Sequence, residues 1–414
     1  MRTKSNNSAE YLILGGGMVA GYAAKELVKL GLKPGEVMIL AAEDALPYER
    51  PPLSKGFLSG KDAEQSTLIN QADFYKNHGI QVKLKTTITN VDLENRRLQS
   101  GSGEQFSFRK LLLATGARAR ALDSPGSDLA NIFYLRSLAD SKNIRSHMNA
   151  VKKAVVIGGG FIGMEVASVV AQKKIDTTLV IRDDRLGGRV FTPEISAFFE
   201  RYYTERGVKL IKQAPVTSFE GRKAIHSVVL ADGRKLDCNM IVAGVGAVPV
   251  TEPIAKSGIA IDNGIIVNEY LETGHPGVYA AGDIANYPDS IFDKRRRVEH
   301  WDNAVSQGQH WAQIMLGDRK PFDHVPYFFS DVFDLSYELW GDASGSDQTI
   351  VRGDLCTPSV SIWWLKQKRL VAVFAMNRPD KERELAPEWI KAKQIVSPAR
   401  LGDNARDARE GVEN

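Results

Sequence analysis

Cysteine is scarce in this chain of 414 residues: only Cys238 and Cys356 occur, and there is no C-x-x-C pair. A redox-active dithiol and a four-cysteine iron or zinc site are therefore excluded. Because a disulfide reductase needs such a dithiol, that class of enzyme is excluded as well. We predict no metal site. A framework of structural disulfides cannot form either, which is typical of a protein in a reducing compartment. We therefore expect a cytoplasmic protein.

Long apolar runs and an excess of charge of one sign are also absent. No segment approaches the roughly 20 apolar residues of a membrane-spanning helix. Residues 1–10 lack the apolar core of a secretory signal, and we expect them to form a disordered lead-in. The net charge of +4 is too small to indicate nucleic acid as the main partner. A chain of 414 residues is expected to hold two or three domains.

The most informative stretch covers residues 152–168, KKAVVIGGGFIGMEVAS. A short apolar strand runs into a G-x-G-x-x-G turn and then into an apolar helix. Gly158 allows the tight turn, Gly160 lets the backbone approach a pyrophosphate, and Gly163 lets the helix pack close to the strand. The free N–H groups at the helix start favour phosphate binding. The residues predicted to contact this dinucleotide are Gly158, Gly160, Phe161, Ile162 and Gly163.

Residues 11–30, YLILGGGMVAGYAAKELVKL, repeat this pattern near the start of the chain. Ala20 stands where the third glycine of the turn often lies. Glu43 follows the next predicted strand, 37–40, where an acid accepts hydrogen bonds from an adenosine ribose; a solvated loop acid is the alternative. Two glycine turns of this kind predict that the chain binds two nucleotides. The residues assigned to this first nucleotide site are Gly15, Gly17, Ala20 and Glu43.

Residues 47–58, PYERPPLSKGFL, form a proline-rich loop that carries two cations, Arg50 and Lys55. Proline fixes the backbone, and a rigid loop with two cations suits a dianionic or electron-rich ligand. The alternative is a stiff surface turn without a ligand. We predict that both cations contact a cofactor.

Three further predicted strands end in small residues, which lets a nucleotide pass close to the backbone. They cover residues 111–117, 240–245, which closes on Gly246, and 278–283. The last ends at Asp283, whose carboxylate can accept hydrogen bonds from the hydroxyls of a sugar alcohol or can cap a helix. The residues predicted here to bind a cofactor are Ala114, Thr115, Gly116, Gly246, Gly282 and Asp283.

The second strand of the second nucleotide unit, 177–181, ends in Arg182-Asp183-Asp184-Arg185. An acid there binds the free 2′-hydroxyl of NAD, whereas an arginine binds the 2′-phosphate of NADP. Unit charges about 4 Å apart interact by roughly 1–4 kcal/mol in wet to half-wet surroundings, so repulsion by Asp183 and attraction by Arg182 are comparable. We favour NADH, bound by Asp183, and keep NADPH open.

The pattern changes after Pro321 to a period close to two. Residues 326–343, PYFFSDVFDLSYELWGDA, are rich in aromatics, and strands are predicted at 359–365 and 370–375. We expect an antiparallel third domain, and we expect its charged tail after about Glu382 to be partly disordered.

The first glycine turn, PYERPPLSK at 47–55, LLLATGA at 111–117, the second glycine turn and VYAAGDIA at 278–285 occur in this order. Together they resemble the flavoprotein reductases of the ferredoxin reductase, monodehydroascorbate reductase and apoptosis-inducing-factor group. The resemblance implies an α/β fold with two Rossmann-like domains, for FAD and NAD(P)H, and a C-terminal α+β domain with an antiparallel sheet. The implied boundaries are 9–120 with 248–320 for FAD, 121–247 for NAD(P)H, and 321–414 for the C-terminal domain.

The resemblance also implies the catalytic pair. Lys55 would lie beside the flavin and pair with Glu165 near the nicotinamide. A buried cation near the flavin favours arrival of the hydride, and a carboxylate partner makes burial of that cation tolerable.

Residues 294–310, KRRRVEHWDNAVSQGQH, join a cationic run to the start of a predicted helix. The run 294–297 is more typical of a solvated loop than of a polyanion site. A helix beginning near Asp302 and aimed at the flavin would stabilise negative charge on the reduced ring. His300 is a candidate general acid, although a hydrogen-bonded structural histidine is favoured. The residues assigned to the cofactor here are Glu299, His300 and Trp301.

The overall likeness is greatest to monodehydroascorbate reductase, through residues 21–36, 296–300 and 334–342. Two positions depart from that family. Val305 stands where it carries an arginine associated with the anionic ascorbate radical, and Phe329, which we also assign to the cofactor site, stands where it has a tyrosine. The segment Phe329-Ser330-Asp331 is nearer to the ferredoxin reductases, which have an aromatic residue, a serine and an acid there.

We therefore predict an enzyme in which NAD(P)H delivers a hydride to FAD and the flavin passes single electrons to an external acceptor. The expected acceptor is a small iron–sulfur protein, a quinone-like molecule or the monodehydroascorbate radical. The alternative is an apoptosis-inducing-factor-like protein that senses redox state and acts mainly through partner binding, supported by the run 294–297. The oligomeric state stays open.

Overall fold

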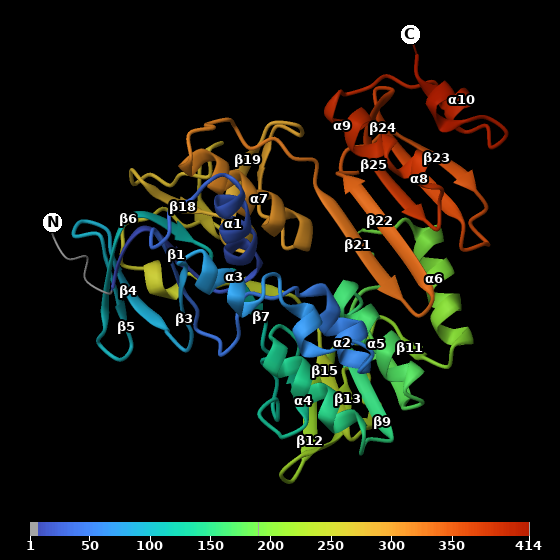
Figure 1. Ribbon diagram of the computed structural model, residues 1–414. Coiled ribbons are helices and arrows are strands. Elements are labelled where there is room, and N and C mark those ends of the chain that lie inside the picture. The colour runs from blue at the N-terminus through green and yellow to red at the C-terminus, as the bar shows by residue number, and fades with distance from the viewer. Residues whose placement is uncertain (1–6, 189, 414) are drawn as a thin grey trace, which may run out of the picture. The chain divides into compact units, whose positions relative to one another are not determined.

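The computed structural model describes residues 7–188 and 190–413 (Figure 1). The chain divides into two compact units, each built from three segments. The first unit comprises Met1–Arg50, Glu64–Arg118 and Val248–Pro326. The second comprises Pro51–Ala63, Ala119–Ala247 and Tyr327–Asn414. The chain therefore passes from one unit to the other five times, and two of these crossings lie in β7 (Ala117–Ala119) and β16 (Ala247–Pro249).

The first unit is built on a seven-stranded sheet of order β3-β2-β1-β6-β5-β4, with β18 also pairing with β6. The apolar strands around β1 pair in parallel, whereas β4 and β5 are antiparallel. Parallel strands buried on both faces are expected to be apolar throughout, as VMIL in β2 is. The strands are β1 (Ser8–Leu14), β2 (Val37–Leu40), β3 (Gln81–Lys83), β4 (Ile88–Asp92), β5 (Arg97–Ser100), β6 (Gln105–Leu113) and β18 (Val278–Ala280).

The expected disordered lead-in is wrong where the structure describes it. Ser8 and Ala9 belong to β1 and pair with Ser107 and Phe108 of β6, so the sheet satisfies their backbone groups. Met1–Asn6 lie outside the described residues.

Two helices of the first unit, α1 (Met18–Lys29) and α7 (Trp301–Met315), pack against each other. Small residues allow this close approach: a Cβ at Gly308 of α7 would lie 2.8 Å from the carbonyl oxygen of Val19. The remaining elements of the unit are α3 (Ala72–Asn77), η2 (Glu64–Thr67), η3 (Glu252–Ile254), η4 (Gly282–Ile284), β17 (Ile265–Ile266), β19 (Ala285–Asp289) and β20 (Lys294–Arg296).

A solvated loop was expected at 294–297, but the structure forms a short strand there, in which Lys294 and Arg295 are exposed. This strand, β20, pairs with β19 in a small sheet. Arg296 forms an ion pair with the buried Asp289 at 2.7 Å, and Arg295 donates to the carbonyl oxygens of Asn286 and Val267. Arg297 donates to the carbonyl oxygen of Asp283. Hence the three arginines of the run bind other groups of the first unit.

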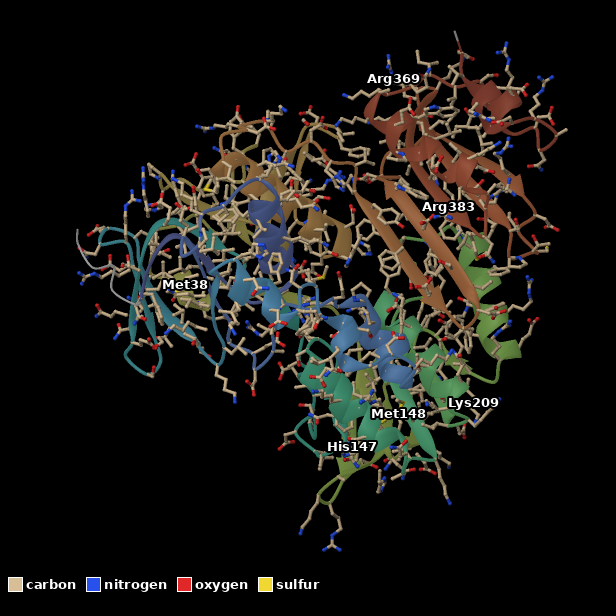
Figure 2. All side chains as sticks on the ribbon, in the orientation of Figure 1. Met38, His147, Met148, Lys209, Arg369 and Arg383 are labelled. Carbon is tan, nitrogen blue, oxygen red and sulfur yellow. The ribbon has the colours of Figure 1, made fainter. Side chains whose placement is uncertain are left out.

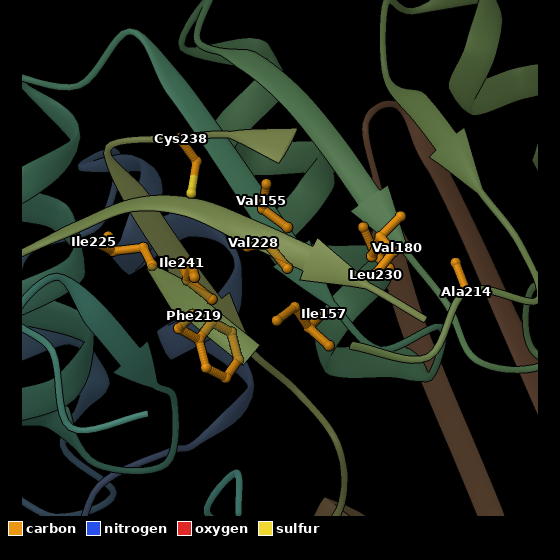
Figure 3. Packing of buried hydrophobic residues seen from close by; sticks show 10 residues of the cluster. All are labelled: Val155, Ile157, Val180, Ala214, Phe219, Ile225, Val228, Leu230, Cys238 and Ile241. Carbon is orange, nitrogen blue, oxygen red and sulfur yellow. The ribbon is translucent and has the colours of Figure 1, made fainter. Parts of the chain in front are cut away.

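The second unit contains a parallel sheet of order β11-β10-β9-β15-β8. Figure 3 shows the core between this sheet and a three-stranded meander, where Phe219 and Val228 of the meander face Val155 and Ile241 of the sheet. The strands are β8 (Ile132–Tyr134), β9 (Lys153–Ile157), β10 (Asp176–Val180), β11 (Lys209–Ile211), β15 (Met240–Ala243) and, in the meander, β12 (Val216–Gly221), β13 (Ile225–Leu230) and β14 (Lys235–Asp237).

The helices of this part begin at side chains that satisfy free backbone N–H groups. Ser137 and Asp140 form a capping box at the start of α4 (Leu138–Met148). Thr192 caps α6 (Pro193–Glu205), which has proline at its first position. By contrast, α5 (Phe161–Gln172) begins at Gly160 without a side-chain cap. The short helices η1 (Pro51–Ser54) and α2 (Gly56–Ser59) belong to the same unit.

The C-terminal part of the second unit is the expected antiparallel sheet, of order β21-β22-β25-β24-β23. Figure 2 labels Arg383 on α8, which donates to Glu338 on β22 at 2.7 Å. The elements are β21 (Tyr327–Val332), β22 (Leu335–Gly341), β23 (Gln348–Gly353), β24 (Val360–Lys366), β25 (Arg369–Met376), α8 (Asp380–Arg383), α9 (Leu385–Lys391), α10 (Pro398–Leu401) and η5 (Ala408–Gly411).

The expectation of partial disorder after Glu382 is wrong for the described residues. Trp389 on α9 is buried and packs against Trp363, with ring centroids 5.9 Å apart. The guanidinium of Arg352, which is 3% exposed, donates to three carbonyl oxygens of the tail. The tail is therefore held by apolar packing and by the buried guanidinium of Arg352.

Acid should weaken the first unit through His310 on α7. This half-buried ring lies against Phe322, with centroids 5.3 Å apart, and burial lowers its pKa; a backbone hydrogen bond at Lys320 and the charge of Asp318 oppose that shift. Because the unfolded chain then binds the proton more readily, the free energy of unfolding falls as the pH falls below the ordinary histidine value of about 6.5.

The measurement is urea unfolding between pH 7 and 5.5. His310→Gln should lose part of the pH dependence, whereas His147→Gln, at an exposed position on α4, should keep it. An equal slope in His310→Gln and the unaltered protein would contradict this assignment.

Candidate functional site

The first glycine turn forms an open cradle at the start of α1. Gly15 has φ of 125°, and a Cβ there would lie 2.1 Å from the carbonyl oxygen of Ala114, so only glycine fits. Gly17 precedes α1 without a side-chain cap, and a Cβ there would meet only Arg50 Nη2, at 3.8 Å. Ala20 is fully buried. The first N–H groups of α1 thus face open space beside a cation, which suits a pyrophosphate.

Arg50 is held beside this turn by an acid and a phenol. Its Nη2 lies 3.2 Å from Glu43, which also accepts a hydrogen bond of 2.6 Å from the Tyr48 hydroxyl. Burial alone would lower the pKa of Arg50, but Tyr48, Glu43 and Asp283 together raise it. Arg50 therefore stays charged. The structure brings Glu43, Arg50 and the first glycine turn together, and their contact with a cofactor stays a prediction.

The strand ends at Ala114 and Asp283 adjoin the same sheet. Thr115 Oγ1 donates to the carbonyl oxygen of Val250 at 2.7 Å, and Gly116 has φ of 65°. The backbone N–H of Gly282 donates to Gln307 Oε1 at 2.7 Å. Gln307 is fully buried, and its Nε2 has no hydrogen-bond partner among the residues that the structure describes. Sequence reasoning missed Gln307, which lies inside α7 and shows no motif.

The start of α7 is fixed by contacts that the sequence did not indicate. Trp301 Nε1 donates to Glu49 at 2.6 Å, and Glu49 also accepts from the Tyr22 hydroxyl. His300 caps the helix and accepts from the backbone N–H of Asp302 at 3.4 Å. This agrees with a structural histidine. Glu299 pairs with Arg297. Contact of Glu299, His300 and Trp301 with a cofactor stays a prediction.

The second glycine turn repeats the geometry of the first. Gly158 has φ of 118°, and a Cβ there would lie 2.2 Å from the carbonyl oxygen of Gly244. A Cβ at Gly163 would lie 1.8 Å from the carbonyl oxygen of Gly158, so α5 packs directly on the strand. A Cβ at Gly160 would meet nothing within 4 Å. This start of α5 is therefore open toward a second pyrophosphate. Ile162 is 40% exposed beside it.

Lys55 and Glu165 form an ion pair inside the second unit. Lys55 Nζ lies 2.8 Å from Glu165 Oε1 and 3.9 Å from Asp331. The ring of Phe329 lies against the same ammonium, 4.9 Å away. Glu165 is 4% exposed and accepts hydrogen bonds from two serines, Ser54 and Ser330. The pairing of Lys55 with Glu165 thus matches what the resemblance implied, but the two serines were not predicted.

The two charges considered for nucleotide choice lie at the end of β10. Arg182 and Asp183 are 3.7 Å apart and are 72% and 52% exposed. Exposed pairs at this distance interact weakly. Both side chains therefore stay able to interact with a bound ribose. Gly246, which lies between β15 and β16, has φ of 113°, and its carbonyl oxygen accepts from the N–H of Arg120.

The predicted residues divide between the two units. Each unit holds a glycine turn at an uncapped helix start, which fits one dinucleotide, and the first unit adds the charged Arg50 and the buried amide of Gln307. In the first unit lie Gly15, Gly17, Ala20, Glu43, Arg50, Ala114, Thr115, Gly116, Gly282, Asp283, Glu299, His300 and Trp301. In the second lie Lys55, Gly158, Gly160, Phe161, Ile162, Gly163, Glu165, Asp183, Gly246 and Phe329.

Other kinds of site find no support in the part of the chain that the structure describes. Cys238 is buried and Cys356 is exposed, and both are free. No cluster of histidine, cysteine or acid side chains there could hold a metal ion. None of the helices in residues 7–188 and 190–413 has the length and apolar character needed to cross a bilayer.

Comparison with known proteins agrees with this geometry. Residues 9–308 match the pyridine nucleotide-disulphide oxidoreductase family, and residues 327–412 match the reductase C-terminal family. A peroxisomal monodehydroascorbate reductase of Arabidopsis thaliana is 37% identical over 94% of this chain and 83% of its own length.

Two solved structures match over nearly the whole chain. The reductase in the covalent putidaredoxin reductase–putidaredoxin complex has a TM-score of 0.93 at 31% identity, covering 98% of both chains. A ferredoxin reductase from Rhodopseudomonas palustris has a TM-score of 0.93 at 32% identity, covering 99% of this chain and 100% of its own. The chain therefore belongs to the pyridine nucleotide-disulphide oxidoreductase family, and it is an oxidoreductase that uses FAD and NAD(P)H.

Proposed function

We propose that this enzyme passes electrons from NADH, through FAD, to a small iron–sulfur protein. The observation that carries the choice of acceptor is the surroundings of Lys55. Its ammonium already faces two carboxylates, Glu165 at 2.8 Å and Asp331 at 3.9 Å. This cluster has no net positive charge to offer a small anionic acceptor. The two solved reductases named above, one of them in complex with putidaredoxin, support a protein acceptor.

The chain's own residues have separate tasks in this proposal. When bound, FAD accepts a pair of electrons from NADH and releases them singly. Arg50 and the start of α1 hold its pyrophosphate, while Glu43 and Asp283 accept hydrogen bonds from its hydroxyls. The start of α5 holds NADH, and Asp183 accepts from the 2′-hydroxyl of its adenosine ribose. Lys55 and Glu165 would provide the charged pair that assists transfer of the hydride.

Reduction of the monodehydroascorbate radical is the second candidate. It is favoured by the 37% identity to the Arabidopsis thaliana enzyme. Against it stands the apolar Val305, which is buried on α7 where an arginine would be expected, and the ring of Phe329 in place of a phenol. The partner-binding alternative loses its support because the arginines of the run 294–297 are bound within the fold. A cytoplasmic location stays part of the proposal.

The experiment that tests this function is steady-state oxidation of NADH and of NADPH with three acceptors. These are ferricyanide, a bacterial-type ferredoxin coupled to cytochrome c, and enzymatically generated monodehydroascorbate. We expect a higher kcat/KM with NADH than with NADPH, and turnover with ferredoxin that exceeds turnover of the radical. Rapid turnover of the radical alone would replace the first proposal with the second candidate.

A further inference from the structure

We propose that Ser54 and Ser330 are positioning residues that hold the Glu165 carboxylate in the orientation in which it binds Lys55. This inference rests on the proposed roles of Lys55 and Glu165 in the reaction. The two serines touch neither nucleotide in this proposal and act through Glu165 alone.

Both carboxylate oxygen atoms of Glu165 accept hydrogen bonds, and each from different donors. Lys55 Nζ and Ser330 Oγ both lie at Oε1, at 2.8 Å and 2.5 Å, while Ser54 Oγ donates to Oε2. Ser54 and Ser330 are 2% and 0% exposed, so water does not replace either hydroxyl. With both oxygens engaged, the carboxylate cannot rotate about its χ angles without losing a donor.

Neutral donors are the suitable choice at this place. A buried carboxylate needs more hydrogen bonds than one ammonium supplies. A second cation would satisfy the free oxygen but would also compete with Lys55 for the charge of Glu165. A serine hydroxyl supplies a hydrogen bond without adding charge. Glu165 therefore keeps Lys55 as its only ion-pair partner among the residues described.

Ser330 is placed by the contact of β21 with one face of α5. Phe328 stacks on Phe161, with centroids 6.2 Å apart, and the backbone N–H of Phe333 donates to Ser168 Oγ at 2.6 Å. The helix residues 161, 165 and 168 are spaced by four and three positions, which puts them on one face. Ser330 lies between these two contacts and meets Glu165. The register of the strand on the helix thus fixes the position of this hydroxyl.

Ser54 is placed by a different segment. It closes η1, directly before Lys55, and its hydroxyl also lies 3.4 Å from the carbonyl oxygen of Pro51. The carbonyl oxygen of Leu53 accepts a hydrogen bond of 2.7 Å from Ser141 on α4, which anchors the turn. Two segments far apart in sequence therefore supply the same kind of donor to one carboxylate. This convergence makes two independent variants available for the test.

The experiment uses Ser54→Ala and Ser330→Ala separately, with two readouts. The first is the rate at which trinitrobenzenesulfonate modifies Lys55 in the apoprotein, followed by peptide mass mapping. A freed Glu165 holds the ammonium less firmly, so we expect labelling of Lys55 to rise about tenfold in each variant. The second is flavin reduction by NADH in the holoenzyme under single-turnover conditions. We expect the limiting rate to fall about tenfold while the Kd for NADH changes less than twofold.

Ser59→Ala is the matched control, because Ser59 lies in the same segment and donates only to the local carbonyl oxygen of Gly56. Labelling of Lys55 in both serine variants at the rate of this control would overturn the inference. Faster labelling with an unchanged rate of flavin reduction would support the positioning role and overturn the proposed catalytic role of the pair. The two failures are therefore distinguishable.

Discussion

Lys55→Met is expected to slow the reduction of the bound flavin by NADH about 100-fold. The substitution keeps a chain of similar length but removes the cation that lies 2.8 Å from Glu165. In the proposed function this cation stabilises the charge that develops as the electron pair arrives, and one such group is typically worth a factor of 100 or more. Stopped-flow absorbance at the flavin band, at saturating NADH, measures the effect.

The control variants separate lost charge from lost folding. Lys61→Met alters an exposed lysine of the same segment and should reduce at the unaltered rate. Lys55→Met also leaves Glu165, which is 4% exposed, as a buried carboxylate without a cationic partner. The double variant Lys55→Met with Glu165→Gln removes the buried, unpaired charge. It should fold normally, and its flavin should still be reduced slowly. A rate for Lys55→Met within twofold of the unaltered enzyme would remove Lys55 from the mechanism.

Arg352→Met is expected to lower the free energy of unfolding of the second unit by about 3 kcal/mol, the loss typical of a broken buried ion network. Arg352 donates to the carbonyl oxygens of Leu401, Asp403 and Arg406, and its Nε lies 3.5 Å from Glu382. Methionine fills much of the space but leaves the three carbonyl groups without these donors. The tail from about α10 onward loses its anchor.

Urea unfolding followed by tryptophan fluorescence measures this loss, because Trp363 and Trp389 pack together next to the tail helices. Arg400→Met on α10, at an exposed position, is the control and should change the free energy by less than 0.5 kcal/mol, as surface substitutions usually do. A loss below about 1 kcal/mol for Arg352→Met would show that the tail is held by its apolar contacts instead.

The sequence predicted what depends on neighbours along the chain. Gly15 and Gly158 were recognisable because a tight turn between a strand and a helix has a local signature, and both have the positive φ that this turn needs. The antiparallel C-terminal sheet was predicted in the same way, because alternation with a period of two is local. The fold class is therefore confirmed.

The sequence did not reveal contacts between distant residues. Glu49 gave no sign of its partners Tyr22 and Trp301, and Gln307 shows no motif. The order of the C-terminal tail and the strand at the run 294–297 were missed for a related reason. A count of charges cannot tell whether Arg352 or Arg296 faces water or an internal acceptor, since that depends on strands paired elsewhere. Ser330 was noted only as part of a segment, and its bond to Glu165 follows from the placement of β21.

The placement of β21 along α5 limits how this protein can be recombined with its relatives. Phe328, Ser330 and Phe333 contact three successive positions of one helix face, and those positions lie in the segment matched by a different family model from their own. A chimaera joined at the boundary between the two matched segments would pair a foreign strand with the native helix. Crossovers that preserve function should therefore exchange α5 and the C-terminal sheet as a single cassette.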